Sequence, residues 1–350
     1  MSELSSLARG LVTPGRSPSL VERWVALWDE REQPHLLVLI RILLSSCVLA
    51  DLAFVGSSGL ARWLWTPSSA GGIAVLDPGH LPLLYRVLPA APLSALLLWS
   101  GMTLSIAAVG VGFFTRSAAL AFVVLSAQAG HINPEADRAV DQVVRLALVL
   151  VAFSAAGKAW SVDARLQTGS FVGELSPANT AWPRYLLLGL LVLIYAAAGL
   201  SKGGTRWFPW GGYGALYVIL QDPSLAAHDF GWLGRPIPYF FTQVATAATY
   251  LWEVSAPVVV LAAHYRRTAE RPGRLRRLVN RLPVRNVYVA VGVVFHLMLA
   301  LSMQLGIFPF AMLALFPAFF RPEELRRALA TARGWRERAQ TLSGPSRGGR

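Results

Sequence analysis

Four long apolar stretches constrain this sequence more than any other feature. Each carries about 20 predominantly apolar residues, and a helix of that length covers the roughly 30 Å hydrocarbon core of a bilayer. The four stretches are Leu36–Gly56, Leu93–Phe113, Pro238–Ala263 and Asn286–Gln304. Of the 350 residues, 54% are hydrophobic and only 15% are charged, which is too little charge for the surface of an ordinary soluble domain. The sequence therefore predicts a membrane protein with several spans.

Weaker apolar stretches complete the predicted bundle. There are four of them: Ser117–Gly130, Pro134–Gly157, Tyr185–Ser201 and Gly306–Phe320. The second begins like a helix, with Asn133 as N-cap, Pro134 at the first helical position and Glu135 after it. We expect an all-α membrane protein, a polytopic bundle of about eight transmembrane helices. Trp207–Leu220 fits an added re-entrant or interfacial segment.

The distribution of Lys and Arg predicts the orientation. If the N-terminus is cytoplasmic, 24 of the 32 basic residues lie in cytoplasmic segments, six lie outside and two lie within spans. This bias follows the positive-inside rule, so both termini are expected in the cytoplasm and the protein in the cell (inner) membrane. The chain then divides into a cytoplasmic segment (1–35), a transmembrane domain (36–322) and a basic cytoplasmic tail (323–350). The first span lacks a small-residue cleavage site behind it, which is typical of a signal-anchor.

The position of the charge and the scarcity of cysteine exclude several protein classes. The net charge is +13, but the two densest groups of Arg border spans and lack the interleaving typical of RNA-binding segments. We therefore expect the lipid bilayer as a partner and no nucleic acid. Cys47 is the only cysteine and the six His residues are scattered, so neither a disulfide scaffold nor a metal site is predicted.

Ionisable residues inside the predicted spans are candidate functional groups, because an unpaired charge in lipid is costly. They are Arg41, Asp51, Asp141, Arg145, Glu253 and His296. Asp137, Asp141 and Arg145 recur at intervals of four, which places them on one helical face. Two interpretations stay open. Asp141 and Arg145 pair with each other, or the face lines a wet cavity with His131 and Asn133 at its mouth.

The other ionisable residues in the spans have simpler interpretations. Arg41 lies close to the cytoplasmic end of its helix and is expected to snorkel towards water. Asp51 lies near the outer end of that helix and can pair with a neighbouring helix. His296 and Glu253 are both expected near mid-depth, and a contact between them would satisfy both groups.

Lys202 is the most specific signal. The chain contains 30 Arg and only two Lys, so a basic residue without a special role would most often be Arg here. Lysine can release its proton once it is desolvated, whereas arginine cannot at useful pH. Lys202 follows the small-residue run Tyr195-Ala-Ala-Ala-Gly199-Leu-Ser, which permits close helix packing. Its position at the outer edge of the membrane fits either a snorkelling lysine or a base.

The segments around Lys202 and His296 resemble those of the HTTM (horizontally transferred transmembrane) family, which includes the vitamin K-dependent gamma-carboxylase. One similar run is Gly199-Leu-Ser-Lys-Gly-Gly-Thr-Arg-Trp207, followed by Gly211 and Tyr213. The other is Phe295-His-Leu-Met, followed by Leu305-Gly-Ile-Phe-Pro-Phe-Ala-Met-Leu313. The resemblance spans Leu36–Pro322. We expect a short form without the large extracytoplasmic domain of the carboxylase, similar to the short bacterial members of the family.

The resemblance implies a cofactor and a site. The cofactor would be a reduced quinone of the vitamin K or menaquinol type. Lys202 would be the catalytic base and His296 would assist it, with Trp207, Phe295 and Glu253 at the cofactor. In the carboxylase, oxidation of reduced vitamin K generates a base that removes a gamma proton from a peptide glutamate, and the carbanion then adds CO₂.

These observations favour two functions over a third. The first is a quinol-dependent enzyme with carboxylase- or epoxidase-like chemistry, in the carbon–carbon lyase class, with an outward-facing site at the membrane edge. The second is a non-catalytic maturation or export partner for a secreted peptide, as in sporulation-delaying toxin maturation. A transporter that uses the buried charged groups is less favoured, because the sequence has no detectable repeat.

Overall fold

The computed structural model describes residues 19–77, 79–173, 179–328 and 330–331, and these residues form a mostly helical structure. The strands in this part of the chain are β1 (Arg31–Glu32) and β2 (Asn179–Thr180), which pair antiparallel. The all-α class is therefore confirmed. Much of the predicted N-terminal segment and most of the basic tail lie outside the described residues.

The helices follow the apolar stretches of the sequence. They are α2 (Leu20–Trp28), α3 (His35–Ser57), α4 (Leu60–Leu64), α5 (Leu83–Val87), α6 (Pro92–Val111), α7 (Thr115–Ile132), α8 (Ala139–Ala152), α9 (Val162–Thr168), α10 (Trp182–Leu200), α11 (Ala215–Leu220), α12 (Pro236–Val254), α13 (Ala256–Arg267), α14 (Arg274–Arg281), α15 (Val284–Ser302) and α16 (Phe308–Leu315). Short 3₁₀ turns join them: Ser68–Ala70, Pro134–Ala136, Thr205–Trp207, Pro209–Gly211, Gly231–Gly234 and Phe316–Phe319.

Several of these helices could cross a membrane. Within the described residues, α3, α6, α10 and α15 are long and apolar enough, and α12 with α13 would form a fifth span bent by 48°. Phe308–Phe319 is a shorter apolar helix. Long apolar helices at these positions mark the chain as a multi-pass membrane protein.

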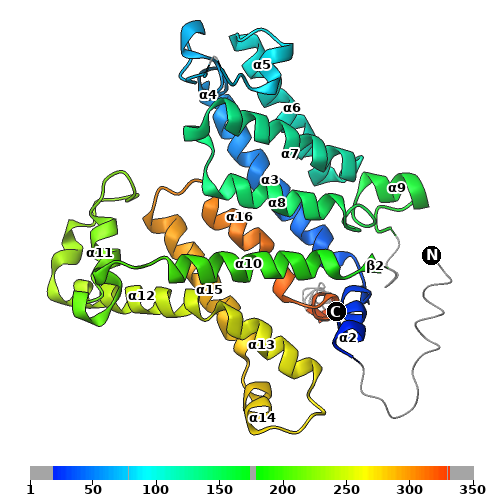
Figure 1. The fold of residues 1–350 in the computed structure, drawn as a ribbon, viewed down its shortest axis with the longest axis vertical. Coiled ribbons are helices and arrows are strands. Elements are labelled where there is room, and N and C mark those ends of the chain that lie inside the picture. The colour runs from blue at the N-terminus through cyan, green and yellow to red at the C-terminus, as the bar shows by residue number, and fades with distance from the viewer. Residues whose placement is uncertain (1–18, 78, 174–178, 329, 332–350) are drawn as a thin grey trace, which may run out of the picture.

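Helix α3 occupies the centre of the molecule. In Figure 1 it crosses the view with α6 and α7 on one side and α10, α12 and α13 on the other, and it packs against α6, α8 and α16. Large buried side chains from these helices form the shared core: Leu37, Ile40, Leu44, Leu98, Ile106, Leu148, Leu187, Leu191 and Met312.

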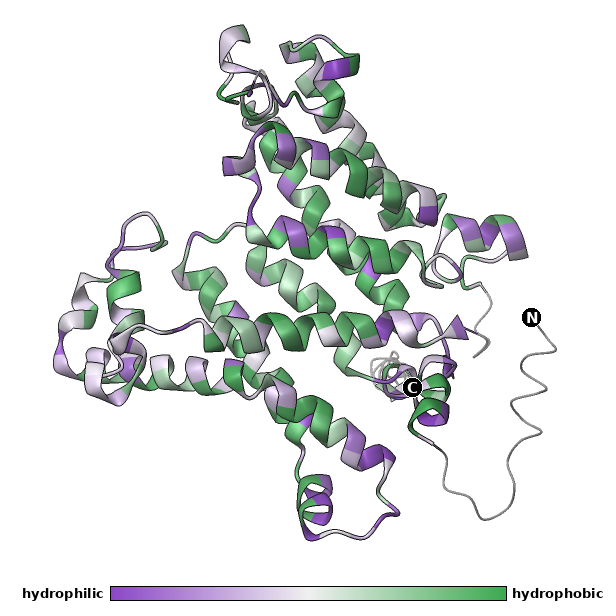
Figure 2. Ribbon diagram, in the orientation of Figure 1, coloured by the Kyte–Doolittle hydropathy of each residue, from purple (hydrophilic) through white to green (hydrophobic). Residues whose placement is uncertain are grey.

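Apolar side chains also cover the outside of the bundle. Figure 2 shows hydrophobic residues along α6, α10, α12 and α15, whereas hydrophilic residues concentrate on α9 and α14. Leu104, Leu193, Leu251 and Leu301 are each more than 60% exposed. So many exposed apolar side chains are rare on soluble monomers but are what lipid contact requires.

The predicted start of the helix at Pro134 is wrong. Pro134–Ala136 is a 3₁₀ turn, Asp137 is extended, and α8 begins at Ala139 with Arg138 as its N-cap residue. Asn133 does not cap a helix with its side chain, because its amide donates a hydrogen bond to the Leu64 carbonyl at 2.7 Å. The helix therefore starts later than the sequence alone predicts, after a turn and an extended residue.

The expectation that Arg41 snorkels is also wrong. Arg41 is fully buried, and its Nη2 donates a hydrogen bond to the Trp160 carbonyl at 2.6 Å. The segment after α8 folds over this end of α3, and Gly112 leaves room for the guanidinium with a left-handed φ of 71°. Tertiary packing covers a side chain that the position in the sequence would place in water.

Candidate functional site

Lys202 and Glu253 form an ion pair. Lys202 follows the last turn of α10, and its Nζ donates hydrogen bonds to Glu253 Oε2 and, at 3.2 Å, to the Ala198 carbonyl. Glu253 lies in the last turn of α12, directly before the bend into α13. The two side chains are 17% and 6% exposed. The structure thus joins two residues that the sequence placed at different depths.

The segment between these residues packs on α12. Trp207–Leu220 is not one helix but the turns Thr205–Trp207 and Pro209–Gly211 followed by α11, which contacts α12. Gln243 Nε2 donates to the Gly212 carbonyl at 2.6 Å, and Thr246 Oγ1 accepts from the Leu216 N–H at 3.1 Å. These hydrogen bonds hold the segment against the first half of α12.

One aromatic ring lies against the ammonium group, and two more follow it in the chain. The Trp207 ring lies 4.9 Å from Lys202 Nζ, within the range of a cation–π interaction. Phe208 stacks on Trp210 with ring centroids 4.8 Å apart, and Trp210 is largely exposed. The structure therefore brings three of the predicted site residues together: Lys202, Glu253 and Trp207.

Gly199 permits the close approach of α10 and α12 at the ion pair. A Cβ at Gly199 would lie 2.9 Å from the Val254 nitrogen and 3.0 Å from Glu253 Cβ, so any side chain must push the helices apart. Gly189 is on the same helix, and a Cβ there would meet nothing within 4 Å. These two glycines offer a matched comparison.

We expect Gly199→Ala to destabilise the protein by about 1–3 kcal/mol, the usual cost of overpacking. Gly189→Ala should be neutral or stabilise by up to about 1 kcal/mol, because alanine favours the helix. Thermal unfolding in detergent micelles measures both. Equal shifts for the two variants would show that Gly199 is not needed for the helix contact.

His296 belongs to a second buried group on α15. It is fully buried, its Nδ1 lies 2.8 Å from the Gly292 carbonyl, and its Nε2 lies 3.2 Å from the Tyr195 hydroxyl. Only a protonated Nδ1 can bond to a carbonyl, so in the neutral ring Nε2 accepts from Tyr195; this tautomer is assigned from the hydrogen bonds. His296 is thus held in one orientation by α10 and by its own helix.

The predicted contact between Glu253 and His296 is wrong. Glu253 turns towards Lys202, whereas the adjacent Trp252 contacts His296, with ring centroids 6.1 Å apart. Trp252 also packs on Tyr195 and Phe295, at 4.6 and 5.0 Å between centroids. Among the described residues, no hydrogen bond, ion pair or ring contact joins His296 to Lys202 or Glu253, so the ion pair and the histidine belong to distinct groups.

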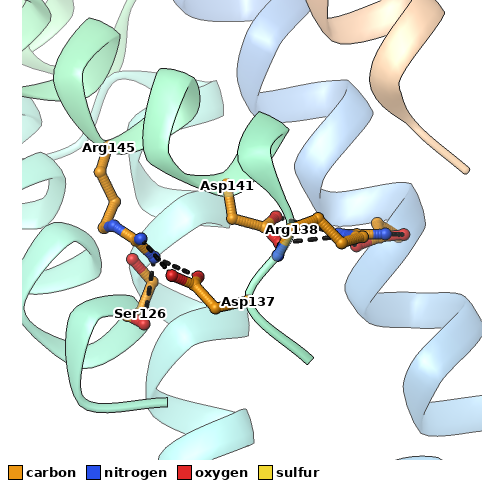
Figure 3. Close-up of polar contacts among 6 residues, drawn as sticks. Ser126, Asp137, Arg138, Asp141 and Arg145 are labelled. Carbon is orange, nitrogen blue, oxygen red and sulfur yellow. Dashed lines mark hydrogen bonds and ion pairs between the residues drawn. The ribbon is translucent and has the colours of Figure 1, made fainter. Parts of the chain in front are cut away.

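A third group surrounds the start of α8, and its pairing differs from the prediction. Arg145 binds Asp137, not Asp141, through two hydrogen bonds of 2.8 and 2.7 Å (Figure 3). Asp141 instead accepts from Arg138 Nε and Nη2, both at 3.0 Å. The reason is the helix break: Asp137 lies outside α8 and is free to turn back over Arg145.

Arg138 also joins α8 to α3. Its Nη2 lies 2.6 Å from Asp51 Oδ2, so one guanidinium binds carboxylates from two helices. The sequence identified Asp51 as a residue needing a partner but gave no signal for Arg138, which looked like one of the few outside basic residues. Tyr195 and Trp252 were missed in the same way, because ordinary aromatic residues carry no motif.

The charged residues of this third group line a cavity of about 280 Å³. Asp141 and Arg145 both contribute to its wall, as the cavity interpretation expected. His131 and Asn133 do not: His131 is exposed, and Asn133 is buried with its amide bound to the Leu64 carbonyl. Within the described residues, no group of three or more His, Cys, Asp or Glu side chains is placed to hold a metal ion.

No family model, no curated protein and no solved structure matches this chain.

Proposed function

We propose that this protein is a membrane-embedded enzyme that acts on a reduced quinone of the vitamin K or menaquinol type, with Lys202 and Glu253 as its proton-transfer pair. The observation that carries the proposal is the ion pair itself: two ionisable side chains, both largely withdrawn from water, with the half-buried Trp207 ring against the ammonium group. A reduced quinone supplies two ionisable hydroxyl groups and two electrons when bound. The reaction class that we propose is carboxylase- or epoxidase-like.

Lys202 and Glu253 can accept a proton from a ligand because a proton can first pass from the Lys202 ammonium group to the Glu253 carboxylate. Desolvation penalises the two charges, so the form with a neutral amine and a protonated carboxyl group competes with the ion pair. The amine of Lys202 then accepts a proton at Nζ from a hydroxyl group placed against it. Glu253 serves as the temporary holder of the first proton and returns it to solvent.

The surrounding residues fit a planar aromatic ligand. Trp207 already lies against Lys202, and Phe208, the next residue in the chain, stacks on the exposed Trp210 ring. A lipid-soluble quinone would reach this site through the membrane. We propose that His296 and Phe295, which both contact Trp252, act indirectly. His296 Nε2 is a fixed acceptor that orients the Tyr195 hydroxyl.

Quinone retention tests the proposal. We expect mass spectrometry of lipid extracts to find a quinone in the purified wild-type protein, and to find less in Lys202→Ala. Lys158→Ala is the matched control, because Lys158 is the only other lysine and is exposed. Lack of quinone in all three folded proteins would refute the enzyme and favour a non-catalytic partner of a secreted peptide.

We also propose eight membrane crossings, with both termini and α14 on the cytoplasmic side of the cell membrane. The 24-to-6 division of basic residues supports this orientation. On α14, Leu275 and Leu278 are exposed beside four Arg residues, the pattern of a helix lying on anionic lipid. In a Cys47→Ser background, we expect an impermeant thiol reagent added outside to label Asp229→Cys and not Arg271→Cys. The reverse labelling would overturn the orientation.

A further inference from the structure

The cavity at the start of α8 lies apart from the Lys202–Glu253 pair. Residues of α3, α4, α6, α7 and α8 line it, together with the turns next to α4 and α8, and none of its described lining residues comes from α10 or α12. Its volume of about 280 Å³ lies just below the range of about 300–1,000 Å³ typical of small-molecule sites. The cavity therefore suits a small ligand.

One wall of the cavity is apolar and aromatic. Leu52 and Val55 of α3, Met102 of α6, Phe122 of α7 and Trp65 after α4 form this wall. Leu52, Met102, Phe122 and Trp65 are all buried in the bundle. Such a surface binds the hydrocarbon part of a ligand, and its aromatic faces attract a cationic group.

Another part of the cavity wall carries an excess of negative charge. It contains four carboxylates, of Asp51, Glu135, Asp137 and Asp141, but only two guanidinium groups, of Arg138 and Arg145. The two arginines bind the three aspartates, as Figure 3 shows for Arg138 with Asp141 and for Arg145 with Asp137. Glu135 forms no hydrogen bond or ion pair with any described residue and is exposed at the cavity. The formal charge of this wall is therefore −2, with one carboxylate available.

We propose that this cavity binds a small amphipathic organic cation, with its ammonium group near Glu135 and its hydrocarbon part against Trp65 and Phe122. The net negative charge selects a cation over an anion. The apolar wall selects an organic ion over a metal, and the described carboxylates do not form a metal-binding group. Asp51 and Asp137 keep side-chain exposures of 17% and 18%, so the cavity is in contact with the surroundings rather than sealed.

Calorimetry on the full chain in phosphatidylcholine nanodiscs tests this proposal. The probes are phenethylammonium and 3-phenylpropanoate, which have similar shape and opposite charge. We expect saturable binding of phenethylammonium and no binding of 3-phenylpropanoate. Empty nanodiscs report adsorption of the cation to lipid.

Two variants and a control locate the site. Glu135→Gln should weaken phenethylammonium binding about fivefold, the effect of one charge about 4 Å away in water-like surroundings. Ser126→Leu should abolish it by filling the cavity, while Glu270→Gln, the same change as Glu135→Gln at an exposed position outside the cavity, should leave it unchanged. A wild-type protein that binds both probes equally or neither would overturn the proposal. So would a folded Ser126→Leu or Glu135→Gln variant with wild-type affinity.

Discussion

Replacing Lys202 with arginine is expected to abolish quinol-dependent activity while leaving the fold intact. Arginine keeps the positive charge that pairs with Glu253, but it does not release a proton at useful pH. Loss of a general base lowers the rate by about 10²–10⁴-fold. The measurement is turnover of the reduced quinone by the purified protein in nanodiscs, with thermal unfolding as the test of folding.

Two comparisons make this experiment decisive. Lys158→Arg is the same substitution at an exposed lysine away from the pair, and we expect it to retain full activity. Glu253→Gln removes the carboxylate that holds the exchanged proton, so it should also lower turnover. A fully active Lys202→Arg variant would refute Lys202 as the base and leave the ion pair with a structural role.

The second large expected effect is a loss of unfolding free energy when the buried ion pair of Arg184 and Glu32 is broken. Arg184 in the first turn of α10 binds Glu32 of β1, with both side chains only 6% exposed and Nε 3.0 and 2.9 Å from the two carboxylate oxygens. Arg184 Nη1 also donates to the Ala318 carbonyl at 3.3 Å. Glu32→Gln leaves this guanidinium buried without its charge partner, so we expect a loss of about 3–5 kcal/mol in unfolding free energy.

Glu30→Gln is the matched control for this prediction. Glu30 pairs with Arg267 at 3.0 Å, but the two side chains are 46% and 33% exposed. Water screens this pair, and its loss should cost less than about 1 kcal/mol. Chemical unfolding of both variants in the same detergent gives the difference. Similar losses would mean that burial does not set the strength of the Glu32–Arg184 pair.

Two of the four long apolar stretches predicted single helices closely, whereas Pro238–Ala263 is divided into α12 and α13 by a bend of 48°. Leu36–Gly56 and Leu93–Phe113 match α3 and α6 to within two residues at each end. The break before α8 was not predictable, because it depends on two distant partners: Asn133 bonds to Leu64, and Asp137 bonds to Arg145. Local helix signals at Pro134 could not report either contact.

In the candidate site, the sequence identified the ionisable residues, but it did not predict which residues pair with each other. The sequence identified Lys202, Glu253 and His296 as residues needing a special environment, since lipid tolerates few unpaired charges. It did not predict that Glu253 binds Lys202 while Trp252 contacts His296, because neighbouring residues on a helix face different directions. Arg41 followed the same pattern: its position predicted exposure, and the segment around Trp160 covered it.

The sequence by itself determined the all-α class, the membrane environment and the inventory of ionisable groups. These properties follow from hydrophobicity and charge, which act through composition and short-range periodicity. Only the tertiary structure decided which charges meet: Lys202 with Glu253, Arg138 with both Asp51 and Asp141, and Arg184 with Glu32. An ion pair depends on the distance between two side chains in space, and most of these partners are separated by dozens of residues along the chain.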